Sequence, residues 1–140
     1  MTRSSQNIIA CTGEALFEIR VSVSPVFCWL YFQEKTPHNF EDLVKHVASL
    51  PSTHIAVSGR NCAMIHDEID DVLMELGKSE ITTTWHEEPD DEAAWDFINL
   101  DFNDNRAACR IVAVIGRDLG QQLAKLSDLV QLCKTALKSE

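Results

Sequence analysis

The sequence contains no long hydrophobic run. None of its apolar stretches approaches the roughly 18 consecutive residues that a membrane-spanning helix requires. The apolar stretch near the N-terminus, Ile8-Ile9-Ala10-Cys11, is too short for a secretory signal. Without a span or a signal, we expect a cytoplasmic protein that has no membrane partner.

Paired cysteines are also lacking. The five cysteines are widely spread and form no C-x-x-C pair, which argues against both a disulfide framework and a zinc finger. Cys28, Cys109 and Cys133 lie in apolar runs, where a free cysteine packs as a small hydrophobic residue. We therefore expect reduced thiols and no bound cofactor.

Glycine and proline are scarce, at five and four residues in 140. No linker rich in them, repeat or low-complexity tract divides the chain, so residues 1–140 are expected to form a single domain. Hydrophobic residues at 45% and charged residues at 24% exclude wholesale disorder. Residues 1–13 show no clear periodicity and are expected to be loosely held.

Basic residues are almost absent from one part of the chain. Residues 61–105, called the acidic segment below, hold 14 acidic residues and one basic residue, Lys78, although the whole chain has a net charge of only −10. A field of this sign repels nucleic-acid phosphates and anionic lipid, and it attracts basic proteins or cations. The segment is therefore either a solvated face or a surface for a basic partner.

Hydrophobic periodicity predicts alternating strands and helices. Residues 16–24 alternate between apolar and polar, as a half-exposed strand does, and residues 26–32 are continuously apolar, as in a strand covered on both faces. The elements expected after them are a helix from Asn39 to Pro51, a strand at 55–57, a helix at 60–76, a strand at 80–85, a helix after Pro89, a strand at 110–115 and a helix from Leu119 to Leu137.

This alternation predicts an α/β fold. Strands joined by helices run parallel, so we expect a three-layer sandwich with a mainly parallel sheet and a flavodoxin-like strand order. Residues 16–24 and 26–32 are expected to form a hairpin that adds an antiparallel edge strand.

Two groups of candidate catalytic or metal-binding residues lie near the expected strand ends, where ligands bind in open α/β sheets. Cys62, His66 and Asp70 share one helix face and could act as nucleophile, base and orienting acid, although Cys62 also fits the apolar stripe. His66 and Asp70 could instead join His86 and Glu87 in a metal site, although the spacing is no recognised metal motif. Glycine-rich phosphate loops are lacking, so nucleotide binding is not expected.

Candidate residues for partner binding cluster inside the acidic segment. Tryptophan is enriched at interface hot spots, and acidic side chains attract basic partners. Trp95 is expected in the core. The predicted partner-binding residues are Trp85, His86, Glu87, Glu88, Asp90, Asp91 and Glu92.

The middle of the chain, residues 55–115, resembles a small bacterial family of uncharacterised domains. The resemblance rests on Ser58-Gly59-x-x-Cys62-x-x-x-His66-Asp67-x-Ile69-Asp70, followed by Thr83-Thr84-Trp85-His86-Glu87. It implies a bacterial source and a compact α/β domain. The family has no established activity, so the resemblance assigns no catalytic role.

Two functional hypotheses follow. The first is a non-enzymatic acidic binding protein, in the manner of an immunity or antitoxin-like inhibitor, that docks a basic partner such as a toxin through the acidic segment. The alternative is a small metal-assisted or thiol-dependent hydrolase with its site at the carboxyl ends of the parallel strands. The first is favoured because the charge signal is large, whereas the enzyme would be assembled from individually ordinary residues.

Overall fold

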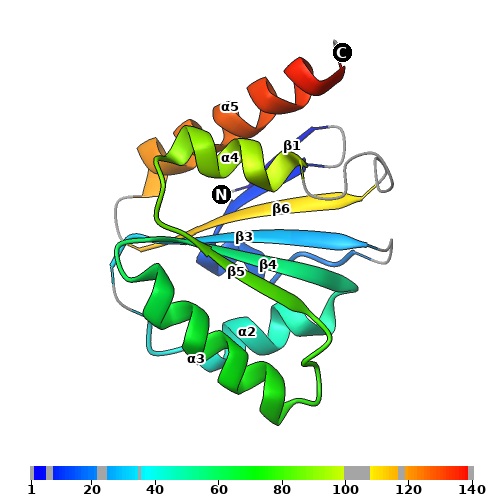
Figure 1. The fold of residues 1–140 in the computed structure, drawn as a ribbon, viewed down its shortest axis with the longest axis vertical. Coiled ribbons are helices and arrows are strands. Elements are labelled where there is room, and N and C mark those ends of the chain that lie inside the picture. Colours follow the sequence, from blue (N-terminus) through cyan, green and yellow to red (C-terminus); the bar gives the residue numbers. More distant parts are fainter. Residues whose placement is uncertain are drawn as a thin grey trace.

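A computed structural model describes residues 2–5, 8–21, 25–34, 36–99, 108–116 and 119–138. Strands and helices alternate along most of the chain (Figure 1). Their bounds are β1 (Thr2–Ser5), β2 (Ile8–Thr12), α1 (Gly13–Leu16), β3 (Val26–Phe32), α2 (Phe40–Ser49), β4 (Ser52–Gly59), α3 (Cys62–Glu75), β5 (Thr82–His86), α4 (Asp90–Asn99), β6 (Cys109–Ile115) and α5 (Leu119–Lys138).

The strands form one sheet in the order β1-β2-β6-β3-β4-β5. The five strands from β2 to β5 in this order are all parallel, and β1 pairs antiparallel with β2. Strands β3 and β6 lie in the middle and are almost wholly buried, as their continuous apolar sequences require. Strand β5 forms one edge of the sheet.

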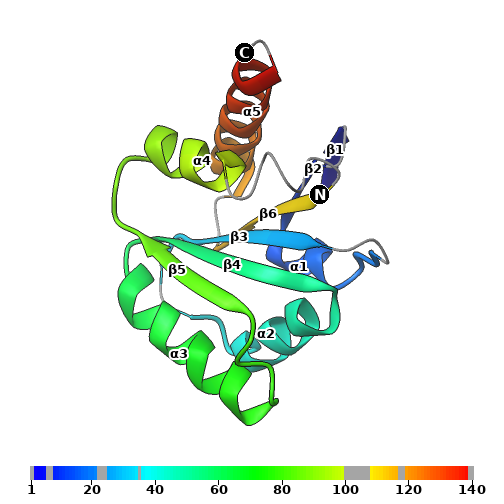
Figure 2. The ribbon, with the colours of Figure 1, turned by 45° about the vertical axis from the view of Figure 1, so that its right-hand side comes forward.

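Helices cover both faces of the sheet (Figures 1 and 2). Helices α1, α2 and α3 pack their apolar stripes on one face, with Leu16, Val44 and Ile69 in that core. Helices α4 and α5 cover the other face, where Phe97 and Leu123 lie in a second core. The fold is therefore a three-layer α/β sandwich with a sheet that is parallel over five strands.

Two parts of the predicted architecture are wrong. Residues 16–21 form no strand, so the expected hairpin does not exist, and residues 26–32 form a central parallel strand instead. The flavodoxin-like order is also wrong. The five parallel strands, numbered along the chain, lie in the order 1-5-2-3-4, whereas the flavodoxin order is 2-1-3-4-5.

The missed strand explains the wrong order. No element was predicted for residues 1–13, but β2 lies there and pairs with β6 over its whole length. The remaining predicted strands and helices are confirmed, with bounds that differ by a few residues. None of the helices in the described ranges is long and apolar enough to cross a membrane.

Candidate functional site

The edge strand β5 carries polar side chains on both of its faces, because successive residues of a strand point to opposite sides. Thr83 and Trp85 face α3, where both contact His66. Thr84 and His86 face the opposite layer and contact each other. The sequence-predicted histidines therefore occupy two separate sites.

The first site joins β5 to α3. The Thr83 hydroxyl donates to Asp70 Oδ1 at 2.5 Å and lies 2.9 Å from His66 Nε2. The other ring nitrogen, Nδ1, is 3.0 Å from Asp67 Oδ1. The Trp85 ring packs against the imidazole with centroids 4.6 Å apart, yet 49% of Trp85 is exposed. These contacts hold the tryptophan in place on an open surface.

Cys62 does not work with His66 in this arrangement. The thiol is buried and donates to the backbone oxygen of His86 at 3.6 Å, while both nitrogens of His66 are bonded elsewhere. Burial, and next the negative charge of Glu87, raise the pKa of Cys62. A nucleophilic cysteine requires the opposite shift, so the structure does not bring Cys62, His66 and Asp70 together as a catalytic site.

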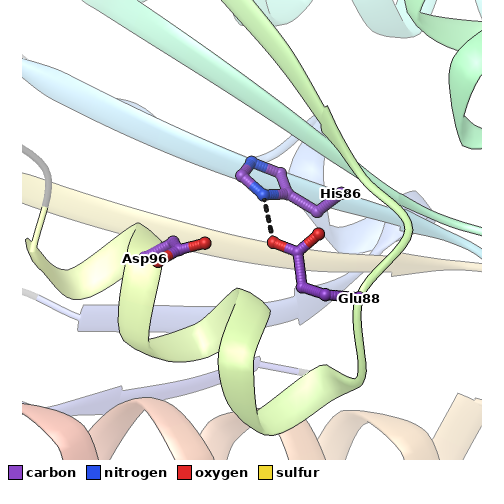
Figure 3. A group of neighbouring side chains, drawn as sticks. All are labelled: His86, Glu88 and Asp96. Carbon is purple, nitrogen blue, oxygen red and sulfur yellow. Dashed lines mark hydrogen bonds and ion pairs between the residues drawn. The ribbon is translucent and has the colours of Figure 1, made fainter.

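The second site lies between the end of β5 and α4 (Figure 3). His86 Nδ1 is 2.8 Å from Glu88 Oε1, and Thr84 Oγ1 is 2.9 Å from His86 Nε2. The carboxyl of Asp96, on α4, points toward Glu88. One ligand atom from each of His86, Glu88 and Asp96 lies within 4.8 Å of the others.

The two carboxyl groups of this site titrate in opposite directions. Partial desolvation, and next the interaction with Glu88, raise the pKa of Asp96, although this side chain is exposed. Burial alone would raise the pKa of Glu88, but hydrogen bonds from its own backbone N–H, from His86 and from Asp96 lower it overall. The two carboxyl groups therefore influence each other's titration.

The predicted metal quartet of His66, Asp70, His86 and Glu87 is not assembled. His66 and His86 lie on opposite faces of β5, and Glu87 is exposed beside the strand end. The sequence predicts His86 as a ligand beside Glu87, whereas the carboxyl next to it in the structure is that of Glu88. The sequence does not indicate Asp96, because no spacing rule links a strand end to the second turn of the helix that follows.

The predicted partner-binding residues divide into two groups. Trp85, Glu87, Asp91 and Glu92 are exposed. His86, Glu88 and Asp90 are half-buried and bonded within the protein, Asp90 to Lys125 and Gln122 at 3.0 Å each. The prediction of a core position for Trp95 is wrong, since 38% of it is exposed on α4.

The acidic segment is poorly neutralised by the protein's own cations. Twelve of its 14 acidic residues fall within the described ranges, and of these only Asp90 contacts a lysine or arginine side chain there. The others that form ion pairs do so with His66 or His86. The segment therefore keeps most of its negative charge.

Two cavities open at the carboxyl ends of the parallel strands, as expected for this architecture. One of about 310 Å³ is lined by Tyr31, Ser58 and Arg60 together with His86 and Glu88. Another, of about 620 Å³, lies at the ends of β2, β3 and β6, where the helices that follow go to opposite faces of the sheet. Its lining side chains include Glu14, Glu34 and His38. The expected contributors Arg117 and Asp118 lie outside the described residues.

A scan of known protein families finds none that matches this chain, and a search of the curated proteins finds no match either. The resemblance of residues 55–115 to a bacterial domain family therefore stays a prediction.

Proposed function

We propose that the protein is a non-enzymatic binding protein that docks a basic protein at the β5 edge. The observation that carries the proposal is the shortage of internal counter-ions around this edge. Among the described acidic residues of the segment, Asp90 alone has a lysine or arginine partner. Charges that are not neutralised internally remain available to steer and hold a cationic partner.

The acidic side chains lie on both sides of this edge. Asp67, Asp71 and Glu75 are exposed on α3, which packs against β5. Asp91 and Glu92 are exposed at the start of α4, which follows the end of β5 directly. Figure 2 shows β5 and the turn into α4 on the same side of the molecule as α3. A partner at β5 would therefore meet negative charge from two layers.

Strand β5 also supplies the non-electrostatic features of an interface. It is the end strand of the sheet, so one row of its backbone groups is available to an added strand. Trp85 offers an exposed aromatic surface whose position is fixed by the contact with His66. We infer that the partner presents a basic, extended segment to this strand, with Trp85 as the central anchor.

An immunity or antitoxin-like inhibitor is the concrete form of this proposal. Proteins that attack nucleic acids are often basic, and an acidic inhibitor binds them rapidly through electrostatic steering. The partner would then be a toxin whose basic surface is blocked by the complex.

The test compares two triple variants of equal charge change. Glu87, Asp91 and Glu92 are replaced by lysine in the first variant, which spares Asp90 because it bonds Lys125. The control carries lysine at Glu14, Glu18 and Asp42, which are exposed outside the acidic segment. Association with the basic protein that co-purifies from the native host is measured at several salt concentrations.

We expect the first variant to lose at least about tenfold in association rate and most of its salt dependence, because rim charges act mainly on the on-rate. The control should change the rate by less than about threefold. Trp85→Ala should weaken the complex by about 30-fold, mainly through faster dissociation. Equal effects of both triple variants, or no effect of either, would rule out the β5 edge as the contact.

A further inference from the structure

We propose that His86, Glu88 and Asp96 form a binding site for one divalent first-row transition metal ion, represented by Zn²⁺ or Mn²⁺. The donor set is one imidazole nitrogen and two carboxylate oxygens, which suits these ions. The three ligand atoms lie within 4.8 Å of one another. The proposal does not rest on the partner surface, since His86 lies on the face of β5 opposite to that of Trp85.

The separations need only small adjustments for metal binding. Ligands about 2.0–2.2 Å from a metal lie roughly 3.3 Å apart in tetrahedral geometry. His86 Nδ1 and Glu88 Oε1 are now 2.8 Å apart, so they must separate by a few tenths of an ångström. Asp96 is exposed on α4, and its carboxyl can rotate toward the other two without disturbing the core.

The far nitrogen of His86 already has the support that metal-binding histidines require. Such a histidine normally donates its second N–H to a hydrogen-bond acceptor, which fixes the ring. Thr84 Oγ1 lies 2.9 Å from His86 Nε2, and the same hydroxyl oxygen is 3.0 Å from Nε2 of the buried His54. With Nε2–H of His86 donating to Thr84, and Thr84 donating to His54, Nδ1 of His86 is left to bind the metal.

The structure also provides access and open coordination positions. His86 and Glu88 line a cavity of about 310 Å³ that also contacts Ser58 and Tyr31. Three protein ligands beside a cavity leave room for water or for a ligand of a partner. Arg60 also lines this cavity, but in the described part of the chain no lysine or arginine forms an ion pair with any of the three donors.

The test is direct metal binding by the full-length, untagged chain after removal of metal with a chelator. Titration calorimetry with Zn²⁺ and Mn²⁺ should give one saturable site, and Co²⁺ should give a visible absorption band that His86→Ala abolishes. His86→Ala and Asp96→Asn should each weaken Zn²⁺ binding at least tenfold. Thr84→Val, which keeps the ligands but removes the support of His86, should weaken it by about tenfold.

Matched controls separate a built site from general attraction to acidic residues. Glu87→Gln and Asp91→Asn remove the same charge close by and should change the Zn²⁺ affinity less than twofold. Equal losses in these controls, binding unaffected by His86→Ala, or no saturable binding in folded protein would overturn the proposal. Asp96→Asn keeps this test valid if His86→Ala unfolds the chain, because Asp96 is exposed. Binding of the basic partner can be measured in the presence of a chelator. The metal-site proposal and the partner-binding proposal can therefore fail independently of each other.

Discussion

At the scale of single residues, the cysteines show how burial determines chemistry. Burial raises the pKa of Cys11 and of Cys28 to about 12. Both thiols lie within the sheet and are fully enclosed. They are therefore packing residues, held in the neutral form far above neutral pH.

The buried thiols predict both slow alkylation and alkaline instability. At about pH 8, iodoacetamide should leave Cys28 unmodified in folded protein, while the half-buried Cys133 reacts first, as followed by peptide mass spectrometry. Because the pKa of about 12 in the folded protein exceeds the ordinary thiol pKa of 9.0, the contribution of Cys28 to stability is complete below pH 9.0 and is lost between pH 9.0 and about 12. Cys28→Ala should reduce that loss, and an unchanged alkaline profile would contradict the assignment.

Gly59 is a residue that the fold requires. Its φ is +113°, and a Cβ there would lie 1.9 Å from the carbonyl oxygen of Phe32, where β3 and β4 end side by side. Gly59→Ala should lower the free energy of unfolding by about 3 kcal/mol, because backbone strain and a steric clash add.

Two other glycines provide matched controls in urea denaturation. Gly77→Ala shares the positive φ but meets no atom within 4 Å, so it should cost only about 1–2 kcal/mol. Gly120→Ala lies in α5 with open space around it and should be stabilising by up to about 1 kcal/mol. If Gly59→Ala costs no more than Gly77→Ala, the close approach to Phe32 is not a constraint.

Among the elements, the edge strand β5 is attached to its neighbours in part by side-chain hydrogen bonds. It pairs with β4 alone among the described strands, and its side chains are mostly exposed or half-buried. The bonds from Thr83 to His66 and Asp70 attach it to α3. The Thr83 hydrogen bonds therefore help to hold this edge strand against α3.

Thr83→Val tests that attachment. Valine keeps the β-branched shape but leaves His66 and Asp70 without the hydroxyl, so the free energy of unfolding should fall by about 1–2 kcal/mol. Thr82→Val, at an exposed position of the same strand, should change it by less than about 0.5 kcal/mol. Chemical denaturation measures both, and amide hydrogen exchange should show the loss concentrated in β5. Equal stability of the two variants would mean that the Thr83 bonds contribute nothing.

The elements also show what could be predicted from sequence. Continuous apolar runs at 26–32 and 110–115 predict buried strands because both sheet faces are covered. The alternation over residues 16–24 led to a wrong prediction of a strand. Ile19 lies in the core and Phe17 and Val21 pack against that core, but these residues belong to an irregular segment. Strand β2 is only five residues long, too short for a clear periodicity, and its place beside β6 depends on tertiary contacts.

Part of the candidate site could also be predicted from sequence. The charge distribution along the chain shows the acidic segment, and Trp85 lies within it. Sequence could not show that His66 and His86 face opposite layers, because that depends on the register of β5 against β4. It could not select Asp96 either, since the angle between α4 and β5 brings that carboxyl to Glu88.

At the scale of the whole molecule, the uncompensated negative charge should weaken folding at low ionic strength. Like charges repel within the compact state, and salt screens this repulsion over about 10 Å at about 0.1 M. The free energy of unfolding should rise by about 1 kcal/mol between about 0.05 and about 0.5 M NaCl. The triple variant Glu87→Gln, Asp91→Asn, Glu92→Gln should respond less. A fall in stability with added salt would show that attractive ion pairs dominate.

The strand order also governs when the chain can fold during synthesis. Among the described strands, β6 is synthesised last, yet it lies between β2 and β3. Until residues 109–115 leave the ribosome, β2 has no parallel neighbour and β3 has one side open. Strands β2 and β3 therefore cannot complete their pairing before β6 is synthesised, and a nascent chain stalled before β6 would expose the unpaired edges of both strands to chaperones.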